Sequence, residues 1–211
     1  MRSAILSLVL LLPAIPAAAE QWELGATAGY GVYRNGSITA NAGTATAGIQ
    51  NRFTVGAFVT DHMYEHLSGE VRYSYQDGGP FLSGAKGKIN AQGKSHTFHY
   101  DMLFHFKDRA QRFRPYVAVG TGVKLFVVNG PVPVSQPLSQ IGILASRDQA
   151  RLVISGGAGI SYQLRKHIVL RADFRDYITP FPKKILAPAA GATARGIFHQ
   201  FTPSFGIGYS F

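Results

Sequence analysis

The 211-residue chain contains no cysteine, a single tryptophan and few charged residues. Without cysteine it has no disulfide bonds, no thiol nucleophile and no thiolate metal ligand. Charged residues make up 15% of the chain, against about 25% in an average soluble domain. A surface this poor in charge is unusual for a soluble protein.

Long apolar runs are missing as well, beyond the first 19 residues. A membrane-spanning helix needs about 20 consecutive, mostly apolar residues, and Gly, Thr, Ser or a charged residue interrupts every later apolar stretch. The chain is instead rich in glycine, with 24 residues, and in aromatic rings, with 14 Phe and 10 Tyr. This composition is typical of a β-sheet whose apolar face contacts lipid.

Residues 1–19 have the pattern of a secretory signal peptide. Arg2 supplies a positive start, an apolar stretch follows, and Ala17 and Ala19 form an A-x-A cleavage site before Glu20. The apolar stretch is too short to span hydrocarbon as a helix. We therefore expect cleavage to leave a mature domain of residues 20–211, and secretion without cysteine is typical of a bacterial envelope protein.

Eight segments of the mature chain alternate between apolar and polar residues with a period of two. Because successive side chains of a strand point to opposite faces, each segment predicts a strand with one apolar face. In the last segment Ile207, Tyr209 and Phe211 share the apolar face, opposite Gly208 and Ser210. The eight predicted strands cover residues 22–33, 49–59, 67–76, 96–106, 115–128, 150–162, 168–177 and about 197–211.

The connections between these strands alternate between long and short. Transmembrane barrels have short periplasmic turns, longer extracellular loops and an even number of strands. We therefore predict an all-β fold, an eight-stranded antiparallel transmembrane barrel in up-and-down order, with both ends of the domain on the periplasmic side. The long connections span residues 34–48, 77–95, 129–149 and 179–196, and the short ones span 61–66, 107–114 and 163–167.

Aromatic residues are predicted to form two girdles at the two headgroup levels. The periplasmic girdle contains Trp22, Phe104, Phe106, Tyr162, Tyr209 and Phe211, and the extracellular girdle contains Tyr33, Tyr73, Tyr75, Phe98, Tyr100 and Phe174. A soluble sandwich would instead concentrate its rings in the middle of the strands.

The stretches TPSFGIGYSF at 202–211 and RPYVAVGTG at 114–122 resemble the small eight-stranded outer-membrane barrels of Gram-negative bacteria, the superfamily around the transmembrane domain of outer membrane protein A and outer membrane protein X. The resemblance covers residues 20–211 and implies a location in the bacterial outer membrane. It also implies that Ile207, Tyr209 and Phe211 form a C-terminal signal for the outer-membrane assembly machinery. Since the last strand ends at the last residue, no peptidoglycan-binding domain is expected.

The polar faces carry charges of both signs, which the barrel would place in its lumen. An eight-stranded barrel is only just wide enough for its side chains to fill it, and unpaired buried charges are costly. We expect a structural charge network in which residues on neighbouring strands reach each other; the alternative is a narrow ion path gated by these pairs. The predicted members of the network are Glu70, Arg72, His99, Asp101, Arg171, Asp173 and Arg175.

His99 and Asp101 have the spacing of a general base and the carboxylate that orients it. Ser68 and Ser95 are conceivable nucleophiles, but no motif matches lipid A deacylases or phospholipases. His62 is expected to be exposed, because it borders a turn, as is His66. We therefore assign no catalytic residue, no metal site and no cofactor, and a lipid A- or phospholipid-modifying enzyme remains an alternative.

The long connections carry eight basic and two acidic residues, a net charge of +6. Basic side chains attract anionic lipids, so we expect outer-membrane lipids and lipopolysaccharide as partners. The protein is expected to be a monomer. Nucleic acid is not expected as a partner, because the chain is secreted. The sequence thus predicts a non-enzymatic barrel with a structural, envelope-integrity or surface-interaction role. Residues 129–140 and 187–196 are expected to be mobile.

Overall fold

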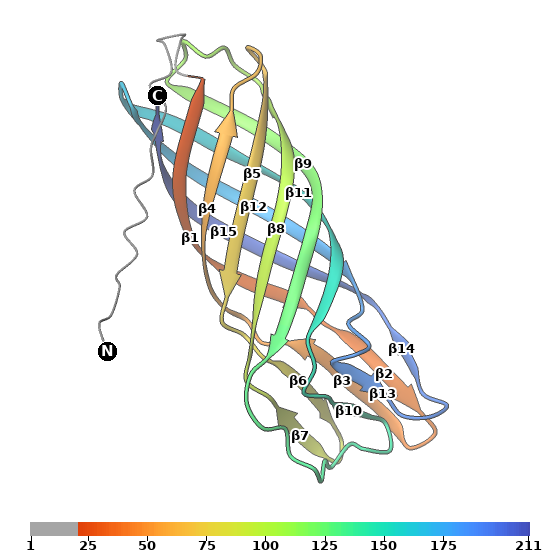
Figure 1. Ribbon diagram of the computed structural model, residues 1–211. Coiled ribbons are helices and arrows are strands. Elements are labelled where there is room, and N and C mark those ends of the chain that lie inside the picture. The colour runs from red at the N-terminus through yellow and green to blue at the C-terminus, as the bar shows by residue number, and fades with distance from the viewer. Residues whose placement is uncertain (1–20) are drawn as a thin grey trace, which may run out of the picture.

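The computed structural model describes residues 21–211; the expected signal peptide and Glu20 lie outside this part of the chain. Within it, no helix is long and apolar enough to cross a membrane. Eight long antiparallel strands close into a barrel (Figure 1). These strands are β1 (Trp22–Arg34), β4 (Arg52–Asp61), β5 (Leu67–Gln76), β8 (Gly93–His105), β9 (Phe113–Val128), β11 (Gln149–Arg165), β12 (Ile168–Pro180) and β15 (Ile197–Ser210).

The barrel is an up-and-down meander, as predicted. Each barrel strand pairs with the next barrel strand along the chain, and β1 closes the cylinder against β15, with Leu24 opposite Tyr209. All eight strands expected from the alternation are confirmed, with ends that shift by a few residues. Because the closed cylinder has no open edge, its backbone groups pair with one another, as a structure inside lipid requires.

Side chains alternate between the outer surface and the lumen. The outer positions are apolar and uncovered, with Phe53 78% and Phe205 75% exposed, whereas Glu70 and Arg175 in the lumen are completely buried. In a transmembrane barrel, hydrocarbon covers this apolar outer band. The predicted orientation, apolar side chains outward and charged ones inward, is therefore confirmed.

The aromatic girdles are present on the outer surface with one exception, Tyr33. Tyr33 points into the lumen, where its ring is buried and its hydroxyl donates to Gln76 Oε1 at 2.9 Å. The prediction placed this residue outside because of its ring, but the period of two along β1 assigns it to the inner face, next to the outward-facing Val32. Exposed girdle rings include Phe104, Phe106, Tyr162, Tyr209 and Phe211 at one end, and Tyr73, Phe98, Tyr100 and Phe174 toward the other.

The short turns lie at one end of the barrel, and the long connections fold together at the opposite end (Figure 1). There they form a five-stranded sheet, in the order β14-β2-β3-β6-β7, and a two-stranded sheet of β10 and β13. We call this region the extracellular cap. Its strands are β2 (Gly36–Ala40), β3 (Gly43–Ile49), β6 (Pro80–Gly84), β7 (Gly87–Asn90), β10 (Gly142–Leu144), β13 (Leu186–Pro188) and β14 (Thr193–Arg195).

The cap contains more regular structure than the sequence suggested for its long connections. Within residues 129–140, Gln136 is buried, and its amide donates to the Leu144 carbonyl at 2.9 Å and accepts the Leu144 N–H at 2.8 Å. The stretch 187–196 contributes to β13 and β14. The hairpins β2–β3 and β6–β7 turn at Gly43 and Gly87, whose φ angles of +124° and +131° favour glycine.

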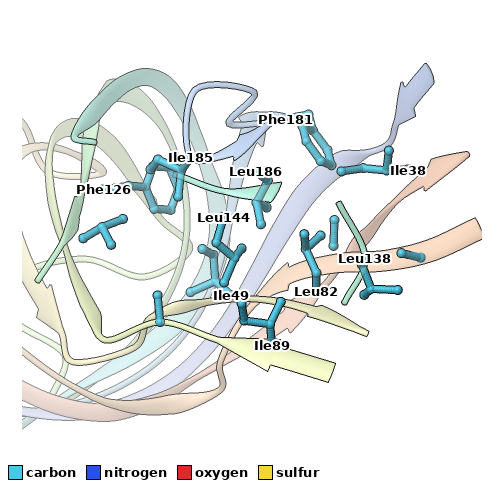
Figure 2. Close-up of a cluster of buried hydrophobic side chains, with 14 of the residues drawn as sticks. Ile38, Ile49, Leu82, Ile89, Phe126, Leu138, Leu144, Phe181, Ile185 and Leu186 are labelled. Atoms are coloured by element: carbon cyan, nitrogen blue, oxygen red, sulfur yellow. The ribbon is translucent and has the colours of Figure 1, made fainter. Parts of the chain in front are cut away.

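The cap has a hydrophobic core of its own that continues into the mouth of the barrel (Figure 2). Ile38 and Leu82 from the five-stranded sheet are completely buried, and so is Leu186 of β13. Phe126 of β9 and Phe198 of β15 belong to the same cluster. Barrel and cap therefore share one apolar cluster, which covers the extracellular end of the lumen.

Candidate functional site

The seven residues predicted to form the lumen charge network lie together in the half of the barrel next to the short turns. They come from three strands and are all buried. β5 supplies Glu70 and Arg72, β8 supplies His99 and Asp101, and β12 supplies Arg171, Asp173 and Arg175.

Glu70 is the centre of the network. Its carboxylate accepts from Arg72 Nε at 2.8 Å and from Arg171 Nη1 at 2.5 Å. Arg175 Nη2 lies 3.5 Å away, and the Thr60 hydroxyl donates at 2.9 Å. One carboxylate thus joins three guanidinium groups and links β4, β5 and β12.

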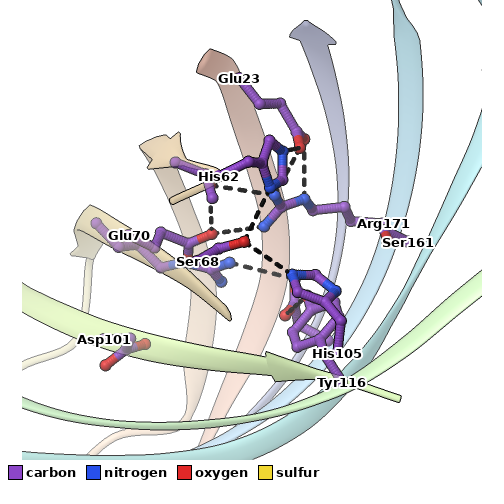
Figure 3. Close-up of polar contacts among 12 residues, drawn as sticks. Glu23, His62, Ser68, Glu70, Asp101, His105, Tyr116, Ser161 and Arg171 are labelled. Atoms are coloured by element: carbon purple, nitrogen blue, oxygen red, sulfur yellow. Dashed lines mark hydrogen bonds and ion pairs between the residues drawn. The ribbon is translucent and has the colours of Figure 1, made fainter. Parts of the chain in front are cut away.

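Arg171 connects this centre to the first strand (Figure 3). Its guanidinium donates from Nε and Nη2 to the two oxygens of Glu23, at 2.9 and 2.7 Å, and Nη2 also donates to Thr60 Oγ1 at 3.1 Å. A two-bond fork of this kind is among the strongest charge-assisted contacts in proteins. The alternation in β1 predicts that Glu23 faces inward, but its pairing with Arg171 was not predicted.

Asp101 and Asp173 hold the opposite end of the network. Arg175 Nη1 donates to Asp101 Oδ2, and Arg72 Nη2 donates to Asp173 Oδ2 at 3.3 Å. The register places Arg72 directly opposite His99. Arg72 nevertheless pairs across the lumen, whereas His99 Nδ1 lies 3.0 Å from Asp101 Oδ1.

Two glycines make room for these large side chains. A Cβ atom at Gly208 would lie 2.1 Å from Glu23 Oε1, and one at Gly157 would lie 2.7 Å from Arg175 Cδ. Both distances are well below contact distance, so any larger residue would displace a member of the network. These two strand glycines are therefore packing positions.

A second polar layer crosses the lumen nearer the cap. Lys124 of β9 donates from Nζ to the Tyr33 hydroxyl at 2.7 Å and to Gln200 Oε1 of β15. The ammonium also lies 4.8 Å from the centre of the Tyr33 ring and 5.3 Å from that of Phe126. Side chains thus cross the lumen at two levels. The period of two along β9 predicts the inward direction of Lys124, but its partner Tyr33 was assigned to the outer surface.

His62, predicted to be exposed, is instead largely buried, with a side chain only 10% exposed. Its Nδ1 lies 2.9 Å from Ser68 Oγ and its Nε2 lies 3.5 Å from Glu23 Oε2. Ser68 Oγ is also 3.1 Å from His105 Nε2. The prediction failed because the chain turns inward at residue 62, whereas His66 is about half exposed, as expected.

The connectivity Ser68–His62–Glu23 is that of a nucleophile, a base and an acid, but its setting does not suit catalysis. Ser68 is completely buried and its hydroxyl is held between two imidazoles. For His99, the buried Nε2 contacts no hydrogen-bond partner in the described part of the chain. Residues 21–211 also contain no group of three or more His, Asp or Glu side chains placed to hold a metal ion.

A closed, eight-stranded barrel with an apolar exterior and a charged, filled lumen defines the class of small transmembrane β-barrels. Residues 4–211 match the family described as the outer membrane protein beta-barrel domain. The chain belongs to this family and is a protein of the bacterial outer membrane. The resemblance noted in the sequence is thereby confirmed.

Solved structures of the same architecture resemble the chain in fold. Neisserial surface protein A is 13% identical, with 92% of this chain and 98% of that chain covered and a TM-score of 0.57. OprG from Pseudomonas aeruginosa is 14% identical over 90% and 96%, with a TM-score of 0.54, and AlkL is 18% identical over 95% of each chain, with a TM-score of 0.52. A search of curated proteins gave no match. At these identities the likeness concerns the fold alone.

Proposed function

We propose that this barrel is a non-enzymatic structural protein that binds the phosphate groups of lipopolysaccharide at its extracellular rim and so contributes to envelope integrity. The observation that carries the proposal is a groove of about 460 Å³ whose lining includes Arg34, Arg195 and His199. We call it the rim groove.

The rim groove lies where the barrel meets the cap. Arg34 is the last residue of β1 and pairs with His199 of β15, while Arg195 ends β14 of the cap. Both arginines are exposed, and within residues 21–211 neither comes within ion-pair distance of a carboxylate. The neighbouring Ile197 is 60% exposed, so the groove borders the outer, lipid-facing surface.

The height of the groove suits the phosphates of the outer leaflet. Tyr30 is an outward-facing ring in edge contact with Phe53, with ring centres 5.2 Å apart. Arg34 follows four residues later, which places it about 10 Å higher at roughly 3.4 Å per residue along a strand tilted by about 40°. Aromatic rings mark the headgroup boundary, so the arginines lie at the level of the charged headgroups.

Guanidinium groups are well suited to this ligand, because their planar fork matches two phosphate oxygens. The anionic outer leaflet would also attract the remaining basic side chains of the cap. Five of these are exposed: Lys86, Lys88, Arg147, Lys183 and Lys184.

The filled lumen supports a structural role rather than conduction. Bonds from Arg171 to Glu70 and from Lys124 to Tyr33 join opposite sides of the barrel at two levels. The hydrophobic cluster of the cap covers the extracellular end. An ion path would require all three layers to open.

The proposal is tested by lipopolysaccharide binding to the purified barrel in detergent. The double variant Arg34→Ser/Arg195→Ser should bind lipopolysaccharide at least tenfold more weakly, since each charge-assisted hydrogen bond contributes about 1.5–3 kcal/mol. Cells carrying this variant should also admit more of a hydrophobic dye across the outer membrane than cells carrying the parent protein.

Lys86→Ser is the matched control, because Lys86 is an exposed basic residue in the turn between β6 and β7, away from the rim groove. It should lose far less affinity than the double variant, because it removes one dispersed cap charge and leaves both arginines of the rim groove in place. Lipid A without its phosphates should bind the parent barrel as weakly as lipopolysaccharide binds the double variant. Equal affinity of the parent and the double variant for lipopolysaccharide would disprove the assignment of the rim groove.

A further inference from the structure

At the end of the barrel with the short turns, the lumen opens into a cavity of about 590 Å³. Glu23 and His62 are among its lining residues, so the lumen network closes it from within (Figure 3). Four basic side chains also line it, three of them from the turn between β8 and β9 and the start of β9. We call this cavity the periplasmic cup, and its basic residues are Arg109, Arg112, Arg114 and Lys166.

In the described part of the chain, no ion pair neutralises the basic side chains of the cup. Among residues 21–211, none of the four basic side chains comes within ion-pair distance of a carboxylate. Glu23 uses both of its oxygens to accept bonds from Arg171. The Glu65 carboxylate accepts the backbone N–H of Arg109 at 2.5 Å, not a guanidinium.

Arg114 is the residue that points most clearly to a ligand. It is only 8% exposed, yet it lines the cavity. Its Nε donates to the Lys107 carbonyl at 3.3 Å and its Nη2 to the Glu65 carbonyl at 2.9 Å, while its Nη1 makes no bond to a described residue. The two carbonyls fix the guanidinium in place, but a buried charge without a counterion is costly. A bound anion would supply that counterion.

We propose that the periplasmic cup binds a phosphate-bearing ligand. Arg112 offers a planar fork for phosphate oxygens, and Lys166 adds a compact positive charge. Arg109 and Arg114 each bond to backbone carbonyls through part of their guanidinium groups and keep further N–H donors for the ligand. The cavity volume lies within the range of about 300–1,000 Å³ typical of sites for small organic molecules, so it accommodates a phosphate ester as well as a bare ion. The ester is either the headgroup of an anionic phospholipid of the inner leaflet or a soluble phosphate ester of the periplasm.

Nuclear magnetic resonance of the arginine Nε–Hε groups tests this inference. The isotope-labelled barrel, in nanodiscs of zwitterionic lipid, is titrated with glycerol 3-phosphate. Saturable shifts of the Arg109, Arg112 and Arg114 signals are expected, with an affinity that falls as salt is added. The variant Arg112→Gln/Lys166→Gln should weaken this binding about tenfold; because Arg112 and Lys166 are exposed, the barrel should still fold.

Arg165→Gln is the matched control, because Arg165 is the exposed last residue of β11, next to Lys166, but does not line the cup. It should bind with near-parent affinity. A second titration replaces part of the nanodisc lipid with phosphatidylglycerol. If the phosphatidylglycerol nanodiscs give the same shifts and glycerol 3-phosphate reverses them, the ligand is the lipid headgroup. If only the titration with glycerol 3-phosphate gives shifts, the ligand is a soluble ester. No saturable shift in either titration, or an equal loss of affinity in Arg165→Gln, would overturn the inference.

Discussion

Replacement of Arg171 by methionine should destabilise the barrel strongly, because this guanidinium joins two buried carboxylates. Arg171 donates two bonds to Glu23, one to Glu70 and one to Thr60. Without it, four buried carboxylates face only two guanidinium groups. Methionine restores most of the side-chain volume, so the loss concerns charge pairing rather than a cavity.

The expected loss in the free energy of unfolding is about 4 kcal/mol, because removal of one partner from a buried ion pair costs about 3–5 kcal/mol. The value lies in the middle of this range because Glu70 keeps its contact with Arg72 at 2.8 Å, whereas Glu23 keeps only His62 at 3.5 Å. The double variant Glu23→Gln/Arg171→Met should be less destabilised than the sum of the two single variants, by about 1–3 kcal/mol.

The assay is reversible unfolding in urea of barrels inserted into lipid vesicles, followed by the fluorescence of Trp22, the one tryptophan of the chain. Arg165→Met, at the exposed last residue of β11, serves as the control and should leave the free energy of unfolding within about 0.5 kcal/mol of the parent value. A loss below about 1 kcal/mol in Arg171→Met, the value of a solvent-exposed ion pair, would refute the reasoning, since it would mean that water screens the network.

Three further predictions concern other parts of the chain. Lys124→Met removes a buried ammonium group whose hydrogen-bond partners are neutral. In the same urea assay it should therefore leave the free energy of unfolding unchanged or raise it by about 1–2 kcal/mol. A loss above about 2 kcal/mol would contradict this. Leu82→Ala, at a completely buried position, should destabilise the cap by about 2–5 kcal/mol. Amide hydrogen exchange should become faster in β3 and β6 but not in β12. An equal acceleration of exchange in all three strands would show instead that cap and barrel unfold together. Phe211→Ala should lower the amount of barrel inserted in cells, because the outward Phe211 is predicted to act in assembly. The free energy of unfolding of the variant in vesicles should change by less than about 1 kcal/mol. Insertion is measured as the heat-modifiable fraction on a gel, and an unchanged fraction would count against the assembly signal.

The strands were predictable because a two-residue period is a local property. Each barrel strand has an apolar outer face and a polar inner face, so the pattern in β5 or β15 alone shows which side chains face lipid. The inward direction of Glu70, Asp101 and Arg175 followed from the same period. Where ring type was preferred over the period, as for Tyr33, the prediction was wrong.

The partners of the lumen charges could not be predicted in the same way. Arg72 lies opposite His99 in the ladder but bonds to Asp173 on a strand across the barrel. Pairing across the lumen depends on the barrel radius, the strand tilt and the reach of each side chain, and none of these is local. The burial of His62 depends likewise on how one turn folds over the mouth of the barrel.

The sequence by itself determined the number of barrel strands, their order and which face of each meets lipid, since the alternation and the lengths of the connections are local features of the chain. Only the tertiary structure decided that the long connections build a cap with a shared apolar core. It also decided that Arg34 and Arg195 line the rim groove and that Arg112 and Lys166 line the periplasmic cup. These sites bring together residues far apart in the chain, and they exist only after closure of the cylinder has fixed the positions of the strand ends.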